Sequence, residues 1–435
     1  MAVRDRIGSL ARPERNVTVA VRHLPEDGHG AAKLRRRRGI VVMKFGGTSV
    51  SDPDQVRRVA ARLVAARDAG DQVVAVLSAM GATTDELLTL ARQVSAHPDP
   101  RELDMLISVG ERISCALCAM AIHDLGREAI SLTGAQAGIV TDGVHGKAKI
   151  VDIRAQRVHE ALEKGRIVLV AGFQGISPAQ EVTTLGRGGS DATAVALAAA
   201  LGAEACEIYT DVDGVFTADP RIVDDSRKLH AVSYDEMLEM AASGANVLQL
   251  RAVEHARNHN VKVHVRSAFN GADGTWVVEA DDRMLEKAMI SGITHTVAEM
   301  IYSVTGIDTV DLFTGLSRAN VNVDTIIQSG KEILFSAPPD DHADVIRVLE
   351  ALGADWSARD DLGKVSIIGA GMKSHPGIAA QAFATLAGEE IATHVVSTSP
   401  IKIACHVSRS DVIRAAQALH SAFRLDSADA TRSHD

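Results

Sequence analysis

Short apolar segments alternate with segments of helical periodicity from residue 40 to about residue 280. Strand patterns occur at residues 40–45, 72–77, 167–173 and 205–210. Helical patterns occur at residues 85–94, 104–125 and 191–201, and Asp52 followed by Pro53 is typical of the start of another helix. This alternation is typical of a sheet covered by helices on both faces. We therefore predict one α/β domain over residues 40–280.

The last third of the chain repeats one order of elements. Strand, helix, strand, strand and helix patterns occur at residues 299–306, 310–319, 321–328, 332–337 and 341–352. The same order recurs at residues 364–369, 376–388, 391–397, 401–407 and 411–423. The repeat indicates an internal duplication of a small ferredoxin-like α+β domain. We predict the two copies over residues 288–355 and 362–426, with a regulatory role favoured over simple subunit assembly.

The acidic balance of the chain argues against some classes of partner. The formal net charge is -10 at pH 7, whereas proteins that bind nucleic acid through its phosphates normally carry a basic surface. The sequence contains no run of 18 apolar residues that could span a membrane. We therefore expect a cytoplasmic protein that acts on small molecules, with neither a nucleic-acid nor a membrane partner.

The first 39 residues differ in composition from the rest. They include the basic run Lys-Leu-Arg-Arg-Arg-Arg at residues 33–38. A nucleic-acid-binding arm is one interpretation of this run. A flexible tail, or an over-extended start with the true start near Val41 or Met43, is the favoured one. Residues 427–435 are expected to form a second, shorter tail.

Cysteine and histidine spacing does not indicate a metal site. Cys115 and Cys118 form a C-x-x-C motif within an apolar helical pattern, and no second such motif is present. A structural role is therefore favoured over a redox or zinc-binding role. His255 and His259 share one helical face but lack a nearby third ligand. We predict no metal site built by the protein alone.

Three glycine-rich turns follow strand patterns in the α/β domain. They lie at residues 44–49, 78–84 and 186–191, and the third opens a helical segment. Glycines let backbone N–H groups approach an anion closely, and a helix amino terminus adds a partial positive charge. Lys44 and Arg187 supply full positive charges. Because the motif G-x-x-x-x-G-K-[ST] is absent, we predict a phosphate or carboxylate site of a kind other than a P-loop.

Several motifs together resemble those of aspartate kinases. K-F-G-G-T-S at 44–49, G-E-R-I-S at 110–114, T-T-L-G-R-G-G-S-D at 183–191 and Y-T-D-V-D-G-V-F-T-A-D-P-R at 209–221 carry the resemblance, with G-M-K-S-H-P-G at 371–377. The resemblance covers about residues 41–425 and implies an amino-acid kinase domain followed by two ACT domains. It also implies transfer of the ATP γ-phosphate to the side-chain carboxylate of L-aspartate. The product, 4-phospho-L-aspartate, would lead to lysine, threonine and methionine, and Mg²⁺ would arrive with ATP.

The resemblance further implies roles for individual residues. Lys44, Arg187 and Asp191 would be catalytic, with Lys44 bridging the phosphates and Asp191 placing Lys44. Thr83, Glu111 and Arg187 would bind aspartate, Glu111 at its ammonium and Arg187 at its carboxylate. The nucleotide would be held by Lys44, Gly46, Gly47, Ser49, Ser78, Gly188, Gly189, Ser190, Thr210, Asp211, Phe216, Asp219, Arg221 and Asn246. The effector positions would be Asn322, Asp324, Gln328 and Ser399.

The chain also departs from the pattern of the family it resembles. Asn246 stands where a lysine that contacts ATP is usual, and loss of one charge-assisted bond costs about 1–3 kcal/mol. Residues 306–312 lack the usual Lys-Pro-Gly effector loop, and Thr393 and Pro400 replace Asn and Glu. We therefore expect feedback by lysine or threonine to be altered or absent.

Two other functions remain open on the sequence. One is an amino-acid kinase for a different carboxylate, against which Glu111 and the paired small domains argue. The other is a non-catalytic amino-acid sensor subunit, which Asn246 favours and Lys44, Arg187 and Asp191 oppose. For the favoured aspartate kinase we expect a homo-oligomer, because ACT domains pair their exposed sheet edges.

Overall fold

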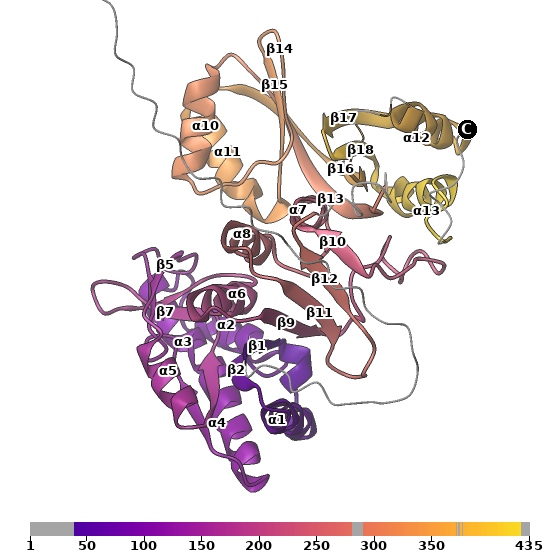
Figure 1. Ribbon diagram of the computed structural model, residues 1–435. Helices are drawn as coiled ribbons and strands as arrows, with labels where there is room; N and C mark the ends of the chain where they lie inside the picture. Colours follow the sequence, from indigo (N-terminus) through magenta and orange to yellow (C-terminus); the bar gives the residue numbers. More distant parts are fainter. Residues whose placement is uncertain (1–38, 281–289, 371, 373–374, 376, 428–435) are drawn as a thin grey trace, which may run out of the picture. The chain divides into compact units, whose positions relative to one another are not determined.

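The computed structural model describes residues 39–280, 290–370, 372, 375 and 377–427 (Figure 1). The two predicted tails, apart from Gly39 and Ser427, lie outside the described residues. The described chain consists of a large α/β part followed by a smaller α+β part, which confirms the predicted fold class.

An eight-stranded sheet in the order β10-β12-β11-β9-β1-β2-β6-β3 forms the centre of the α/β part. Neighbouring strands from β11 through β9, β1, β2 and β6 to β3 run parallel, whereas β12 is antiparallel to β11. The strands are β1 (Ile40–Phe45), β2 (Gln72–Leu77), β3 (Ala129–Leu132), β6 (Ile167–Ala171), β9 (Ala205–Thr210), β10 (Ala231–Ser233), β11 (Val263–Ser267) and β12 (Thr275–Val278).

Both faces of this sheet are covered by helices, as the alternation in the sequence predicts. Val73, Ala75 and Leu77 of β2 point into one hydrophobic core, with α1 (Pro53–Asp68) and α4 (Val109–Asp124). Val74 and Val76 point into the other core. The helices of that second face are α5 (Gln156–Glu163), α6 (Gly189–Leu201), α7 (Tyr234–Ala242) and α8 (Leu250–His259).

Two local predictions have different outcomes. The side chain of Asp52 accepts hydrogen bonds from the backbone of Asp54 and Gln55, and Pro53 opens α1, so the predicted helix start is confirmed. The single helix predicted at 104–125 is wrong, because the chain forms α3 (Pro100–Ile107) and α4, which meet at Ser108. The side chain of Asp99 caps α3 one turn earlier than predicted. Residues 100–124 together are long and apolar enough to cross a membrane, but half of their most apolar stretch is buried in the fold.

A four-stranded sheet in the order β5-β4-β7-β8 lies beside the main one. Its strands are β4 (Ile139–Thr141), β5 (Ile150–Ile153), β7 (Gln174–Ile176) and β8 (Val182–Thr184). Since β8 ends immediately before residues 186–191, this small sheet determines where the third glycine-rich turn begins. Helix α2 (Thr83–Val94) follows the second turn.

The carboxy-terminal part forms one six-stranded sheet in the order β14-β15-β13-β16-β18-β17. The predicted repeat of elements is confirmed, and the long strands β13 and β16 pair antiparallel at its centre. The first repeat is β13 (Gly292–Thr305), α10 (Thr309–Arg318), β14 (Ile326–Ser329), β15 (Glu332–Ala337) and α11 (His342–Ala351). The second is β16 (Asp355–Ile368), α12 (Gly377–Gly388), β17 (Thr393–Ser399), β18 (Lys402–Ser408) and α13 (Val412–Ala422).

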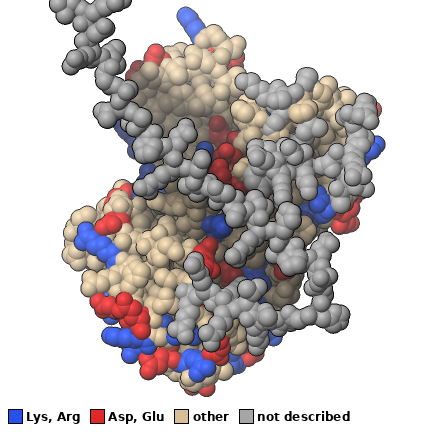
Figure 2. Space-filling model, viewed as in Figure 1, with Lys and Arg blue, Asp and Glu red and all other residues tan. Residues whose placement is uncertain are grey.

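The strand predicted at 321–328 is shorter in the structure. Only Ile326–Ser329 pairs regularly with β15. The Ser336 hydroxyl accepts a hydrogen bond from the Thr325 N–H. Just before β14, a side chain therefore replaces a backbone carbonyl as the acceptor. The described surface in Figure 2 shows basic and acidic side chains interspersed, without a continuous basic patch on the visible face.

Candidate active site

The candidate site lies where adjacent parallel strands of the main sheet end. Phe45 of β1 pairs with Leu77 of β2 and with Tyr209 of β9, so the segments that follow these strands start side by side. Hydrogen bonds from Gly46 N to Tyr209 O (3.3 Å) and from Ser78 N to Phe45 O (3.1 Å) connect them. Ligands of open α/β sheets bind at this edge, outside the carboxyl ends of the strands.

Lys44 and Asp191 form an ion pair at this edge. Lys44 Nζ lies 2.6 Å from Asp191 Oδ1, and the two side chains are only 12% and 8% exposed. Asp191 belongs to the first turn of α6, in which Gly189 and Ser190 are buried as well. Lys44 therefore holds its positive charge near the amino terminus of a helix, where backbone N–H groups lack partners within the helix.

The first and second glycine-rich turns are in direct contact. A Cβ at Gly47 would lie 3.0 Å from the carbonyl oxygen of Ala79, so this approach favours glycine. Gly81 N donates to Gly47 O (3.1 Å). The hydroxyl of Ser49 is buried in the same region and has no partner among the described residues. A buried hydroxyl without a partner is costly, and a bound phosphate would supply one.

Glu111 also has an oxygen that the described protein atoms leave unpartnered. Its side chain is 3% exposed; Oε1 accepts a hydrogen bond from Ala79 N (3.2 Å), and Oε2 has no partner. Burial raises the pKa of Glu111 to about 7. Thr83 is near, because a Cβ at Gly110 would lie 3.6 Å from its methyl group. A ligand ammonium group bonded to Oε2 would satisfy this oxygen and favour the charged form of Glu111.

Arg187 lies on the third turn but points away from the other candidates. Its side chain is 95% exposed, and its ion-pair partner is Asp340 at 3.9 Å. Gly188 beside it has φ +71°, and a Cβ there would overlap the side chain of Gln249. The backbone of the turn is therefore held tightly, whereas the Arg187 side chain is not.

The remaining nucleotide candidates occupy the segments after β9 and α7. Thr210 donates to Asp211 Oδ1 (3.0 Å), and Asp219 pairs with Arg221 (2.7 Å). Hydrogen bonds from Arg221 lower the pKa of Asp219. Asn246 is exposed between α7 and α8. No contact in the described residues joins these groups to Lys44, so their part in one nucleotide site stays a prediction.

The four effector candidates are not all brought together within one chain. Gln328 lies in β14 and Ser399 in β17, the opposite edges of the six-stranded sheet. Asp324 pairs with the buried Lys364 and lies 3.9 Å from Lys402. Its carboxylate therefore already has cationic neighbours from its own chain.

Comparisons with known proteins show which family the chain belongs to. The amino acid kinase family matches residues 39–267, and an ACT domain matches residues 365–423. An aspartokinase of Mycolicibacterium smegmatis is 50% identical over an alignment of 409 residues, and the match covers 90% of this chain and 97% of that protein. This chain belongs to the aspartokinase family.

Solved aspartokinases share the fold of the chain. Escherichia coli aspartokinase III in complex with aspartate and ADP (R-state) matches 88% of this chain and 100% of that chain, with TM-score 0.79 and 24% identity. The same enzyme with lysine and aspartate (T-state) matches 88% of this chain and 99% of that chain, with TM-score 0.69 and 25% identity. Membership of the aspartokinase family confirms the resemblance seen in the sequence.

Sequence reasoning missed three residues that hold the third turn of this aspartokinase family member. Arg251 donates to the carbonyl of Leu185 (2.8 Å), and Gln249 packs against Gly188. Asp104 is buried and bonded to Thr184 at the end of β8. Of these three, only Asp104 could have been noticed in the sequence, because it is an acidic residue within the apolar pattern of residues 103–107.

Proposed function

We propose that this chain transfers the γ-phosphoryl group of ATP to the side-chain carboxylate of L-aspartate. The Lys44–Asp191 pair (2.6 Å) at the amino terminus of α6 carries the proposal, beside a second turn whose Ala79 contacts Glu111. A kinase for an amino acid needs a cation for the phosphates and an acceptor for the ammonium group. The M. smegmatis relative is an aspartokinase, and E. coli aspartokinase III was solved with aspartate and ADP.

The reaction requires positioning and charge stabilisation more than covalent help from the protein. An oxygen of the substrate carboxylate attacks the γ-phosphorus, the bond to the β–γ bridging oxygen breaks, and ADP leaves with that electron pair. The product is 4-phospho-L-aspartate. Lys44 and the N–H groups at the start of α6 would stabilise the charge on the transferring group. No protein nucleophile is needed, because the substrate carboxylate is already ionised at neutral pH.

The substrate would be bound from two sides. The unpartnered oxygen of Glu111 would accept from the ammonium group, with Thr83 nearby. The exposed Arg187 side chain would turn over its glycine-rich turn onto the α-carboxylate, where its planar guanidinium can make two hydrogen bonds. Only this substrate-bound arrangement would bring Arg187 to the site.

The nucleotide would bring its own metal ion. The described residues include no group of three or more His, Cys, Asp or Glu that could hold a metal. Mg²⁺ usually keeps several waters and is bound through substrate phosphates with one or two carboxylates. Such an ion would neutralise phosphate charge, and Gly46, Gly47, Ser49 and Ser190 would contact the phosphates directly.

We also propose that feedback by lysine or threonine is altered or absent. E. coli aspartokinase III was solved in complex with lysine and aspartate (T-state). In this chain Lys364 and Lys402 already surround Asp324. A ligand ammonium would have to displace them, which weakens binding. Inhibition curves with each amino acid alone and together test this; inhibition by either at low concentration with ordinary cooperativity would refute it.

The direct test is ATP- and aspartate-dependent formation of an acyl phosphate, trapped with hydroxylamine. Wild type should form the hydroxamate, and Lys44→Ala should lose it, because the cation at the phosphates is gone. Other amino acids with side-chain carboxylates should be poor substrates. A folded but inactive wild type would instead favour the non-catalytic sensor subunit, with Asn246 in place of the usual lysine.

A further inference from the structure

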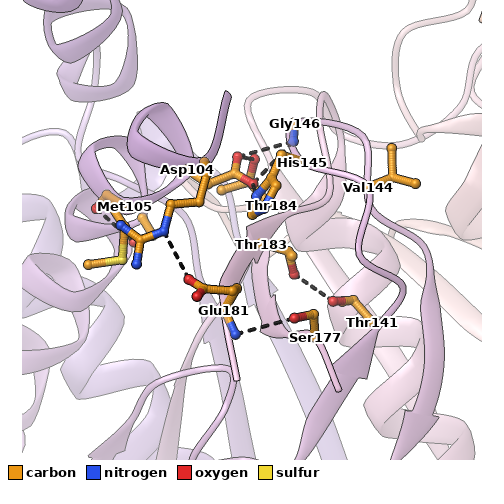
Figure 3. A network of polar contacts seen from close by, with 12 residues as sticks. Asp104, Met105, Thr141, Val144, His145, Gly146, Ser177, Glu181, Thr183 and Thr184 are labelled. Carbon is orange, nitrogen blue, oxygen red and sulfur yellow. Dashed lines mark hydrogen bonds and ion pairs between the residues drawn. The ribbon is translucent and has the colours of Figure 1, made fainter. Parts of the chain in front are cut away.

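Asp104 is a buried carboxylate that collects hydrogen bonds from two other segments. Asp104 lies on α3 (Figure 3) and is only 1% exposed to solvent. His145 Nδ1 lies 2.7 Å from Oδ2, Gly146 N lies 3.2 Å from both oxygens, and the Thr184 hydroxyl donates to Oδ1 at 2.5 Å. Because a carboxylate can only accept, Nδ1 of His145 must carry the proton of its bond. These donors offset the cost of burying the carboxylate.

The partners of Asp104 belong to two segments of the small four-stranded sheet. His145 and Gly146 lie in the loop between β4 and β5, and Thr184 is the last residue of β8. The same loop also bonds to β8 directly, from Ala148 N to Thr184 O (2.9 Å). A Cβ at Gly186 would lie 3.1 Å from Gly146 O, so the loop supports the third glycine-rich turn itself.

Asp104 thereby connects the two residues proposed to bind the ends of aspartate. On one side, α3 leads through Ser108 into α4, which carries Glu111. The Ser108 carbonyl accepts from Gln174 Nε2 (2.7 Å), which fixes that junction against β7. On the other side, Thr184 leads directly into the turn with Arg187. A shift of Asp104 changes the spacing between the ammonium and carboxylate contacts.

We propose that Asp104 is a positioning residue for the aspartate subsite. Through Thr184 and the β4–β5 loop, it sets the third glycine-rich turn at the correct distance from Glu111. The inference rests on the proposed kinase function. Among the described residues, no hydrogen bond or ion pair joins Asp104 to Lys44 or to the segment after β9. The part of the third turn that would contact the phosphates is also held by the Lys44–Asp191 pair, so we expect loss of Asp104 to affect aspartate binding more than nucleotide binding.

The variant Asp104→Asn keeps the shape of the side chain. Its amide NH₂ would face the groups of His145, Gly146 and Thr184 that donate to the carboxylate. We expect KM for aspartate to rise about tenfold or more, with KM for ATP and kcat each changed less than about threefold. Calorimetric titration with aspartate, and separately with a non-hydrolysable ATP analogue, should show the same contrast without turnover. That titration separates failure of this inference from failure of the proposed function, which wild-type activity tests by itself.

The matched control is Glu181→Gln. Glu181, labelled in Figure 3, lies directly before β8 and forms an exposed ion pair with Arg101 of α3 (2.9 Å). Exposed pairs contribute little, so this variant should retain wild-type affinity for aspartate. If Glu181→Gln weakened aspartate binding as much as Asp104→Asn did, any loosening of α3 would suffice and the specific role of Asp104 would be rejected.

A second pair of variants covers the case in which Asp104→Asn does not fold. Thr184→Val removes one donor at constant volume, whereas Thr184→Ser retains the hydroxyl. We expect a raised KM for aspartate in Thr184→Val and rescue in Thr184→Ser. Equal losses of aspartate and nucleotide affinity in Thr184→Val, or no loss in either, would overturn the proposal.

Discussion

Glu111, Lys44 and Asp191 are ionisable residues that the fold buries at one edge of the main sheet. Burial raises the pKa of Glu111 to about 7, while Lys44 and Asp191 neutralise each other at 2.6 Å. The ammonium group of a substrate would neutralise the charge of Glu111. The negative charges of a nucleotide would interact with Lys44. The charge of the site is therefore set by what binds to it as much as by its own residues.

The raised pKa of Glu111 predicts an acidic limb in the pH profile. The free enzyme protonates Glu111 as the pH falls through about 7, and a neutral carboxyl binds an ammonium group less well. We expect kcat/KM for aspartate to fall below that pH, with ATP affinity less affected. Glu111→Gln should lower kcat/KM at high pH and flatten the limb. A limb of unchanged midpoint in Glu111→Gln would assign it to another group.

The Lys44–Asp191 pair predicts a separation of stability from activity. Lys44→Met should abolish phosphoryl transfer and also destabilise the fold by about 3–5 kcal/mol, because Asp191 is left as an uncompensated buried charge. Adding Asp191→Asn should restore much of the stability without restoring activity. Urea unfolding measures the first effect and the hydroxamate assay the second. If the free energy of unfolding of Lys44→Met equalled that of wild type, the prediction would be contradicted, because water would then be solvating the Asp191 carboxylate.

At the scale of elements, the structure shows how turns and junctions shape the site. Ser108 separates α3 from α4, so Asp104 and Glu111 belong to different helices rather than to one. Each helix can then be held by its own partners, Thr184 for α3 and Ala79 for α4. The junction between α7 and α8 carries the exposed Asn246.

A substitution at this junction is expected to improve the use of ATP. Because Asn246 is exposed, Asn246→Lys introduces a cation without disturbing the core. If this segment faces the phosphates, KM for ATP should fall, by up to about tenfold for a gain near 1.4 kcal/mol. KM for aspartate should stay near the wild-type value. Asn246→Gln is the control for side-chain length, and an equal effect from it would show that charge is not the cause.

At the scale of the whole described chain, the second repeat of the carboxy-terminal part contacts the predicted nucleotide segment. His420 Nε2 of α13 lies 3.0 Å from the hydroxyl of Thr217, and Gln417 donates to the carbonyl of Ile222 (2.6 Å). Thr217 directly follows Phe216, a nucleotide candidate. A shift of α13 would therefore be felt directly by the segment that is predicted to bind the nucleotide.

His420 also predicts a pH dependence of stability. Burial lowers its pKa from 6.5, so below that pH the unfolded chain binds more protons at this position than the folded chain. Its contribution to the free energy of unfolding is fully present above pH 6.5 and is lost as the pH falls through the lowered value. Urea unfolding at several pH values should show this decline, and His420→Gln should make it shallower. Equal slopes in both proteins would contradict the prediction.

Residue patterns along the chain were enough to predict the alternating α/β pattern, the start of α1, the three glycine-rich turns and the duplicated carboxy-terminal order. These features depend on periodicity and turn chemistry among residues close together in the chain, so they can be inferred without a fold. The motifs were also enough to indicate the family and its reaction.

The construction of the candidate site could be seen only in the folded chain. The pairing of Lys44 with Asp191, the unpartnered oxygen and raised pKa of Glu111, the exposure of Arg187 and the network around Asp104 all depend on distant segments. The break at Ser108 was missed because the apolar pattern continues across it. Burial and the contacts between distant segments set the state of an ionisable group, and neither is encoded in local spacing.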